Sequence, residues 1–278
     1  MTGQLRFISI SSGSAGNCCL LQYIPDTVAS RPFGLVIDAG ISLRRLKRDL
    51  TAVGLGFDSI DAVLITHDHF DHIRHLGSWC KRLKKPVYAT AALHAALSTN
   101  FMTRDHIAPC RKVLQLGEPM VTGPFSILAF EVPHDATQTV GFAIKVMDPE
   151  ADSPAETYDY VHITDCGKIP AEAIRYASHS STVTIESNYD MDMLLKGKYP
   201  AMLKSRIRGG HGHMSNDECA EALKEINHPG LKHVFLCHLS HNNNTPQLAV
   251  QAASQVIDPH TVSLRALPRQ SPTPLINL

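Results

Sequence analysis

Short apolar stretches separated by turn-forming residues open the chain. The stretches cover residues 5–10, 18–24 and 33–38, and the segment SSGSAGN separates the first two. Runs of this length rich in Leu, Ile, Val and aromatic residues, bounded by Gly and Ser, predict β-strands joined by turns. From about Ser42 the apolar positions, Leu43, Leu46 and Leu50, recur every three or four residues, which predicts a helix.

Strand and helix patterns continue to alternate along the rest of the chain. Further strands are predicted at 60–66, 86–89, 125–133, 140–147, 158–165 and 232–238, and helices after residue 70 and at 169–177, 215–227 and 245–257. The 215–227 segment begins with a capping box, Ser215 with Glu218 three residues later. We therefore expect a single α/β domain over residues 1–278, with sheets inside and helices outside. The proline-rich tail from about residue 267 is predicted to be loosely held.

Composition limits the binding partners and the cellular compartment that we expect for the protein. Lys+Arg and Asp+Glu both total 26, so no global charge indicates a polyanion or a membrane as partner. We find no signal peptide and no apolar run of the ~20 residues that span a bilayer. The seven cysteines contain no C-x-x-C pair and predict reduced thiols in a cytoplasmic protein. Local basic clusters remain at 44–48, 81–85 and 204–208, and the last two are candidates for flanking a phosphate-binding groove.

Histidine is the unusual residue type, with 16 in the chain, and several gather in ITHDHFDHIRHLG at 65–77. The preceding run, 60–66, lacks polar alternation after Asp61 and predicts a strand buried on both faces. His67 and His69 are two residues apart, so in an extended chain their side chains point to the same side and can reach one metal-binding position. Asp71 and His72 can reach a second position nearby. Imidazole with carboxylate suits zinc, manganese or iron better than calcium. The alternative is a polar loop that happens to be rich in histidine.

The motif His67-x-His69-x-Asp71-His72 resembles the signature of the metallo-β-lactamase superfamily. More narrowly, SSGSAGNCCLL, VIDAGIS, ITDCG, ESNYD, GGHGHMSN and CHLSHNNN resemble the WalJ/YycJ-like subgroup, which is associated with metal-dependent nuclease activity. The resemblance implies an αββα sandwich of two mixed sheets with helices on the outer faces. It also implies a site for two divalent transition-metal ions at one edge of the sheets, with zinc or manganese favoured and iron as a third candidate.

The resemblance implies the remaining ligands one by one. His134 follows an apolar run and completes one metal site with His67 and His69. His238, at the end of the last core strand, would join Asp71 and His72 on the second metal; His233 stands at the wrong end of that strand. Asp165, again at a strand end, would bridge both metals. Its neighbour Cys166 is the rival, because lactam-opening members of the superfamily use a cysteine ligand.

Three further residues are candidates for contact with the substrate. His213 resembles a histidine that related nucleases place near the scissile phosphate, although a polar turn before the Ser215 cap would also explain it. Ser14 and Asn17, in SGSAGN, can lie beside the metals, or belong to a plain hairpin turn. Asp71 has a second expected role, as acceptor of a proton during the reaction.

These expectations combine into a metal-dependent phosphodiester hydrolase acting on nucleic acid, with an exonuclease and DNA favoured. A hydroxide bridging the two metals would attack phosphorus in line. A phosphodiesterase for a small cyclic phosphate shares the same ligands and is the first alternative. Hydrolysis of a thioester or lactam is the second, and a metal-stabilised binding protein without turnover is the third.

Overall fold

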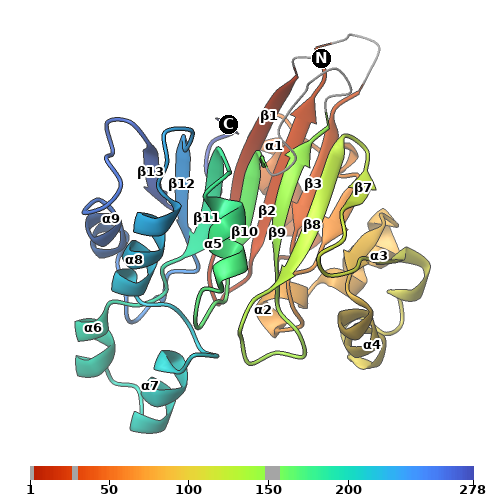
Figure 1. Cartoon of the computed structure of the whole chain (residues 1–278). Helices are drawn as coiled ribbons and strands as arrows, with labels where there is room; N and C mark the ends of the chain where they lie inside the picture. The colour runs from red at the N-terminus through yellow and green to blue at the C-terminus, as the bar shows by residue number, and fades with distance from the viewer. Residues whose placement is uncertain (1–2, 27–30, 148–156) are drawn as a thin grey trace.

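The structure is a computed structural model that describes residues 3–26, 31–147 and 157–278, and it contains two seven-stranded sheets (Figure 1). In spatial order, the first sheet is β14 (Ile276–Asn277), β1 (Gln4–Ser11), β2 (Cys18–Ile24), β3 (Phe33–Ile37), β4 (Ala62–Leu64), β5 (Val87–Ala89) and β6 (Arg111–Val113). The second is β13 (Ser263–Ala266), β12 (His233–Cys237), β11 (Thr182–Glu186), β10 (Tyr160–Ile163), β9 (Val140–Val146), β8 (Phe125–Glu131) and β7 (Met120–Thr122).

Each sheet is half antiparallel and half parallel. Strands β14 to β3 and β7 to β10 pair antiparallel, whereas β3 to β6 and β10 to β13 pair parallel. Parallel neighbours need crossover connections, and these contain the helices. The helices are α1 (Leu43–Thr51), α2 (Phe70–Ile73), α3 (Leu76–Leu83), α4 (Ala91–Thr99), α5 (Ala171–Ala177), α6 (Met191–Lys196), α7 (Ala201–Arg208), α8 (Asn216–Ile226) and α9 (Pro246–Ala253), with short 3-10 turns at Phe57–Ser59 and Ala108–Cys110. The predicted arrangement of two mixed sheets with helices is confirmed.

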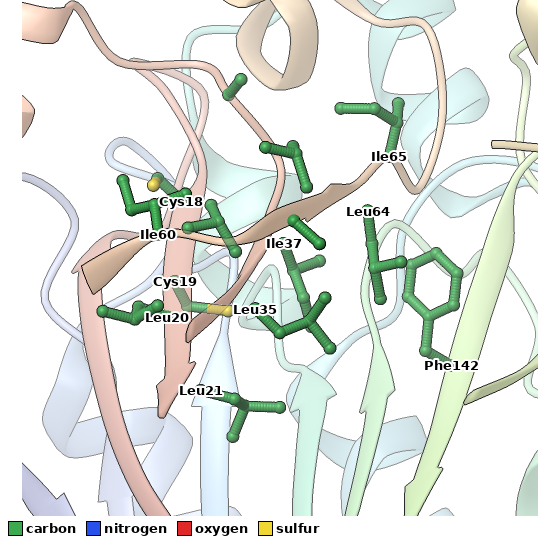
Figure 2. Close-up of a cluster of buried hydrophobic side chains, with 14 of the residues drawn as sticks. Cys18, Cys19, Leu20, Leu21, Leu35, Ile37, Ile60, Leu64, Ile65 and Phe142 are labelled. Atoms are coloured by element: carbon green, nitrogen blue, oxygen red, sulfur yellow. The ribbon is translucent and has the colours of Figure 1, made fainter. Parts of the chain in front are cut away.

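The two sheets share one apolar core. One cluster of buried side chains contains residues of both sheets, and the rings of Phe7 in β1 and Phe235 in β12 stack at 4.8 Å between centroids. Figure 2 shows part of this cluster, with Phe142 of the second sheet drawn among first-sheet side chains such as Leu35 and Leu64. A second cluster lies on the other face of the second sheet, where α5 packs on β9 and β10 and α8 packs against α5 and α9. Burial of both faces explains the near-continuous apolar sequence of the central strands.

The predicted strands and the capping box are found, but several elements had no clear sequence signal. Ser215 accepts from the Glu218 amide while the Glu218 carboxylate accepts from Ser215, as the capping box predicts. Helix α7 was missed because it buries none of its side chains and so shows no apolar stripe. Strand β11 was also missed, although its sequence TVTIE is entirely buried.

The segment after residue 267 is attached to the sheets rather than loosely held, which differs from our expectation. Its last residues form β14, which pairs with β1, and the Thr273 amide donates to the Ser9 carbonyl at 2.8 Å. Arg269 donates to three backbone carbonyls of the loop after β12, those of Leu239, Ser240 and Asn244, at 2.8, 2.6 and 2.8 Å. The pairing of β14 with β1 and the contact of Thr273 with Ser9 each span more than two hundred residues of sequence, so proline content, which is a local property, could not reveal them.

The two basic clusters that were candidates for flanking a phosphate-binding groove have different positions. Lys85 lies 3.8 Å from Asp61, which precedes β4 and therefore stands at the end of that strand opposite His67. Cluster 81–85 is thus far from the histidine motif, and its proposed place beside a phosphate groove is wrong. Cluster 204–208 lies on α7, next to the pocket described below. Within the described ranges, no helix has the length and apolar character needed to cross a bilayer.

Candidate metal centre

The candidate site lies where the parallel strands of both sheets end. In the first sheet, Asp38 follows β3 and His67 follows β4; in the second, Asp165 follows β10, Glu186 ends β11 and His238 follows β12. The carboxyl ends of parallel strands lie at one edge of a sheet, so the topology alone brings these residues together. Helix α2 begins immediately after His69 at the same edge (Figure 1).

Three of these strand-end residues have left-handed backbone conformations. The φ angles are 64° at Asp38, 50° at Asp165 and 55° at His238. A left-handed conformation costs an L-residue other than glycine roughly 1–2 kcal/mol, and Asn and Asp tolerate it best. Such residues concentrate at functional sites, where the chain must turn sharply and still present a side chain.

His67, His69 and His134 form the first group of converging nitrogens. One ring nitrogen from each lies within 4.8 Å of the others, and His134 Nε2 is 3.2 Å from His69 Nδ1. His67 is fully buried, its Nδ1 lies 3.0 Å from the Thr66 hydroxyl, and its Nε2 has no hydrogen-bond partner among the residues that the structure describes. A buried nitrogen without a partner is costly unless something else binds it. A metal ion fits that requirement, and three histidines are a familiar zinc-binding set.

Asp71, His72 and His238 form the second group. The Asp71 Oδ2 atom lies 3.5 Å from His72 Nε2 and 3.3 Å from His238 Nε2. The three donor atoms also fall within 4.8 Å of one another. The side chains predicted to hold two metals are therefore brought together in two adjacent groups, as the resemblance implied.

Asp165 lies between the two groups and is buried. Its carboxylate is 3.2 Å from His72 Nε2, 3.3 Å from His238 Nδ1 and 3.7 Å from His134 Nε2. Because it reaches both groups, this position supports the prediction that it bridges two cations. Cys166, its rival, packs in the second apolar cluster, and burial raises the pKa of its thiol well above the usual value.

Hydrogen bonds at the second ring nitrogen orient three of the histidines. Asp38 Oδ2 accepts from His72 Nδ1 at 2.7 Å, Glu186 Oε1 from His238 Nδ1 at 3.0 Å, and the Gly212 carbonyl from His134 Nδ1 at 2.8 Å. Each bond fixes the tautomer and leaves Nε2 available to a metal. Carboxylates behind two of the imidazoles also make those ligands more basic.

The protonation preferences of three donors, His67, His134 and Asp165, suit a cation. At His72 and His238, burial opposes protonation, but the facing carboxylates outweigh it and raise the pKa of both imidazoles. Burial, reinforced by the neighbouring His72, lowers the pKa of His67 well below its usual value. Burial also lowers the pKa of His134. Burial opposes ionisation of Asp165, but His238 and His72 outweigh it and hold the pKa of that carboxyl well below its usual range. Neutral imidazoles and ionised carboxylates are the forms that bind metal.

Glu186 is a site residue that our sequence analysis missed. It is fully buried, and its carboxylate accepts from His213 Nδ1 at 2.8 Å as well as from His238. The signal was present, because Glu186 ends an apolar run in the same way as Asp165. His213 itself lies beside the metal groups, 3.7 Å from Asp165, and is partly open to the pocket.

Ser14 and Asn17 occupy different positions. Ser14 is exposed and lines the pocket over the metal groups. Asn17 is buried, and its Nδ2 lies 2.9 Å from Asp71 Oδ2 and 2.8 Å from His72 Nε2. This placement favours a role for Asn17 in holding Asp71 over direct contact with substrate.

An open pocket of about 220 Å³ lies above the metal groups. Its walls are Ser14, His69, Asp71, Asp135, Asp165, Asn188, Tyr199, Leu203, Arg206, Ile207, Gly212, His213, His238 and Ser240. Helix α7 and the residues before it form one wall of this pocket. This helix was not among those predicted from the sequence.

Comparison with known proteins agrees with this geometry. The family model described as "Beta-lactamase superfamily domain" matches residues 34–239. The chain is 28% identical to "Exodeoxyribonuclease YycJ" of Bacillus anthracis over 91% of this chain and 89% of that protein. It is 27% identical to "Exodeoxyribonuclease WalJ" of Streptococcus pneumoniae over 88% of this chain and 85% of that protein.

Solved structures share the fold. The metallo-beta-lactamase fold protein YhfI of Bacillus subtilis superposes with a TM-score of 0.65 at 18% identity, covering 97% of this chain and 99% of that one. The Zn²⁺-bound PqqB of Methylobacterium extorquens gives a TM-score of 0.68 at 16% identity, covering 96% and 99%. The expected metallo-hydrolase class is confirmed, and the chain belongs to the β-lactamase superfamily domain family, with the metallo-β-lactamase fold.

Proposed function

We propose that the protein is a metal-dependent exonuclease that acts on DNA. The observation that carries the proposal is the convergence of His67, His69, Asp71, His72, His134, Asp165 and His238 into two adjacent groups under an open pocket. The names of the relatives from Bacillus anthracis and Streptococcus pneumoniae, which align over most of their length, support the choice of DNA and of an exonuclease.

The chain's own residues would hold two divalent ions. His67, His69 and His134 would hold one, and Asp71, His72 and His238 the other, with Asp165 shared between them. Zinc or manganese suits this mixture of imidazole and carboxylate. When bound, the ions would supply a nucleophilic oxygen at neutral pH and neutralise charge on the phosphate oxygens.

His213 is the candidate general acid. Its Nδ1 is engaged by Glu186, which leaves Nε2 as the ring nitrogen that can meet a substrate in the pocket. Burial opposes protonation of this imidazole, but the Glu186 carboxylate outweighs burial and raises the pKa of His213. A proton held on Nε2 can pass to the leaving oxygen. Asp71, at the pocket wall, remains the candidate acceptor of a proton released during attack.

The same geometry disfavours one of the alternative functions, lactam hydrolysis, and leaves another open. A lactamase-like site would need the Cys166 thiol among the metal ligands, but that thiol is buried in the apolar cluster below the site. A small cyclic phosphate would meet the same ligands and is separated from DNA only by experiment.

The test is hydrolysis by metal-loaded protein of three substrates: end-labelled single-stranded DNA, a closed circular single strand of the same sequence, and a small cyclic phosphodiester. We expect stepwise shortening of the linear strand, no cutting of the circle, and little turnover of the cyclic compound. Cutting of the circle would show an endonuclease instead. Turnover of the cyclic compound alone would favour the phosphodiesterase alternative.

A further inference from the structure

The segment 191–208, which comprises α6, α7 and their connection, projects beyond the sheets beside the metal groups, and we call it the arm (Figure 1). Helix α7 buries no side chain and α6 buries only Leu194, so the arm contributes little to the core. The arm contains many more basic than acidic residues. Lys196, Lys198, Lys204, Arg206 and Arg208 stand against a single acidic residue, Asp192.

Arg206 is the basic residue of the arm that lines the pocket. Its Nε donates to Asp135 Oδ2 at 2.5 Å, and its side chain is 62% exposed. Asp135 connects it to the first metal group, because the Asp135 backbone oxygen accepts from His69 Nε2 at 3.1 Å. The guanidinium is therefore held one side chain away from the histidines, at the rim of the pocket.

The contact with Asp135 uses one of the three guanidinium nitrogens of Arg206. Nε donates to the Asp135 carboxylate, and the two terminal nitrogens make no hydrogen bond with the described residues. A guanidinium has five donors in a planar fork, which matches two oxygens of one phosphate. Arg206 is thus already oriented by Asp135, which reduces the entropy lost when an anion binds.

We propose that Arg206 binds a phosphate next to the scissile one, so that the arm selects polynucleotides over small phosphodiesters. The inference rests on the proposed function. The scissile phosphate belongs between the metal groups, where Asp165 lies, and Arg206 stands outside them beyond Asp135. A phosphate one nucleotide along the strand is the anion that this position can meet. The ring of Tyr199, another pocket wall in the arm, is then available to the adjoining base.

The test compares two substrates and three variants. The substrates are a single-stranded oligonucleotide and bis(4-nitrophenyl) phosphate, which has only one phosphate. The variants are Arg206→Ala, Arg206→Lys and the control Arg208→Ala, an exposed arginine of the same helix that does not line this pocket. The metal content of each is measured alongside kcat/KM.

For Arg206→Ala we expect the ratio of kcat/KM for the oligonucleotide to that for the one-phosphate substrate to fall about 10- to 100-fold, the effect of losing a charged hydrogen bond. The slope of log kcat/KM against log salt should become shallower by about 0.7 for a single strand. The ratio for Arg206→Lys should lie between those of the wild type and Arg206→Ala, because lysine keeps the positive charge but lacks the paired donors of the guanidinium. Arg208→Ala should leave the ratio within about twofold.

Two outcomes would overturn the inference separately from the function. An unchanged ratio in Arg206→Ala, with the wild type degrading the oligonucleotide, refutes the role of Arg206 alone. A parallel loss on both substrates together with loss of metal assigns Arg206 to support of Asp135 and the histidines instead. If the wild type hydrolyses only the one-phosphate compound, the proposed function is wrong and the inference is wrong with it.

Discussion

Replacing Glu186 by glutamine removes one charge from the interior with almost no change of volume. Four donors meet its two carboxylate oxygens. His213 and His238 donate to Oε1 at 2.8 and 3.0 Å, and the amides of Cys166 and Met214 donate to Oε2 at 2.9 and 3.1 Å. Glutamine has only one acceptor oxygen, so its NH₂ group must face two donors in either orientation.

The size of the effect of Glu186→Gln depends on which pair of donors loses its acceptor, the two imidazoles or the two backbone amides. If the NH₂ group faces the imidazoles, His238 loses the partner that fixes its tautomer, and metal affinity should fall about 10- to 100-fold, or about 1.4–2.7 kcal/mol. If it faces the backbone amides, two buried N–H groups lose their partner at roughly 1–3 kcal/mol each. Either orientation of Glu186→Gln therefore produces a measurable loss.

The assay is a competition titration of zinc with a chromophoric chelator, combined with urea unfolding of the metal-free protein. Glu221→Gln is the matched control, because Glu221 is exposed on α8 and should change neither quantity. If Glu186→Gln keeps zinc affinity within threefold and the free energy of unfolding within about 0.5 kcal/mol of wild type, the reasoning from four converging donors is refuted.

Three further predictions concern the site and its support. Asp165→Ala should abolish hydrolysis and weaken binding of both ions, whereas Cys166→Ser should be mild; metal analysis showing the reverse would return the lactamase-like ligand set. His213→Ala should keep both ions and reduce kcat roughly 10²- to 10⁴-fold, while His211→Ala changes little, and near-normal turnover in the first would leave His213 a structural residue. Arg269→Ala should lower the free energy of unfolding by about 1.5–3 kcal/mol, measured in urea, since it removes three hydrogen bonds to the loop after β12, and an unchanged midpoint would contradict this.

The site residues that the sequence revealed share one local feature. His67, Asp165 and His238 each follow a buried apolar strand, so strand pattern and residue type together indicated where they would lie. Asp38 has the same local feature but was not expected to be a ligand. Glu186 was not identified because strand β11, which it ends, was not predicted. Their contribution became visible only through contacts with histidines from other elements, His72 of helix α2 and His238 after β12.

Other features could not be predicted from local sequence at all. The pairing of Arg206 with Asp135 joins two separate connections of the second sheet, one between β8 and β9 and one between β11 and β12, and no period or motif encodes it. The attachment of the segment after residue 267 was not predicted for the same reason, because proline content reports local backbone preference and not the pairing of β14 with the distant β1. Long-range packing decided both cases.

The attachment of residues 267–277 has a consequence for the order in which the protein is made. Synthesis proceeds from the N-terminus, and domains begin to fold as the chain emerges. Strands β1 to β6 are complete long before Arg269 leaves the ribosome, yet the loop that follows His238 depends on Arg269 for three of its carbonyl contacts. The surroundings of His238 are therefore completed only after strands β1 to β6 of the first sheet have been synthesised.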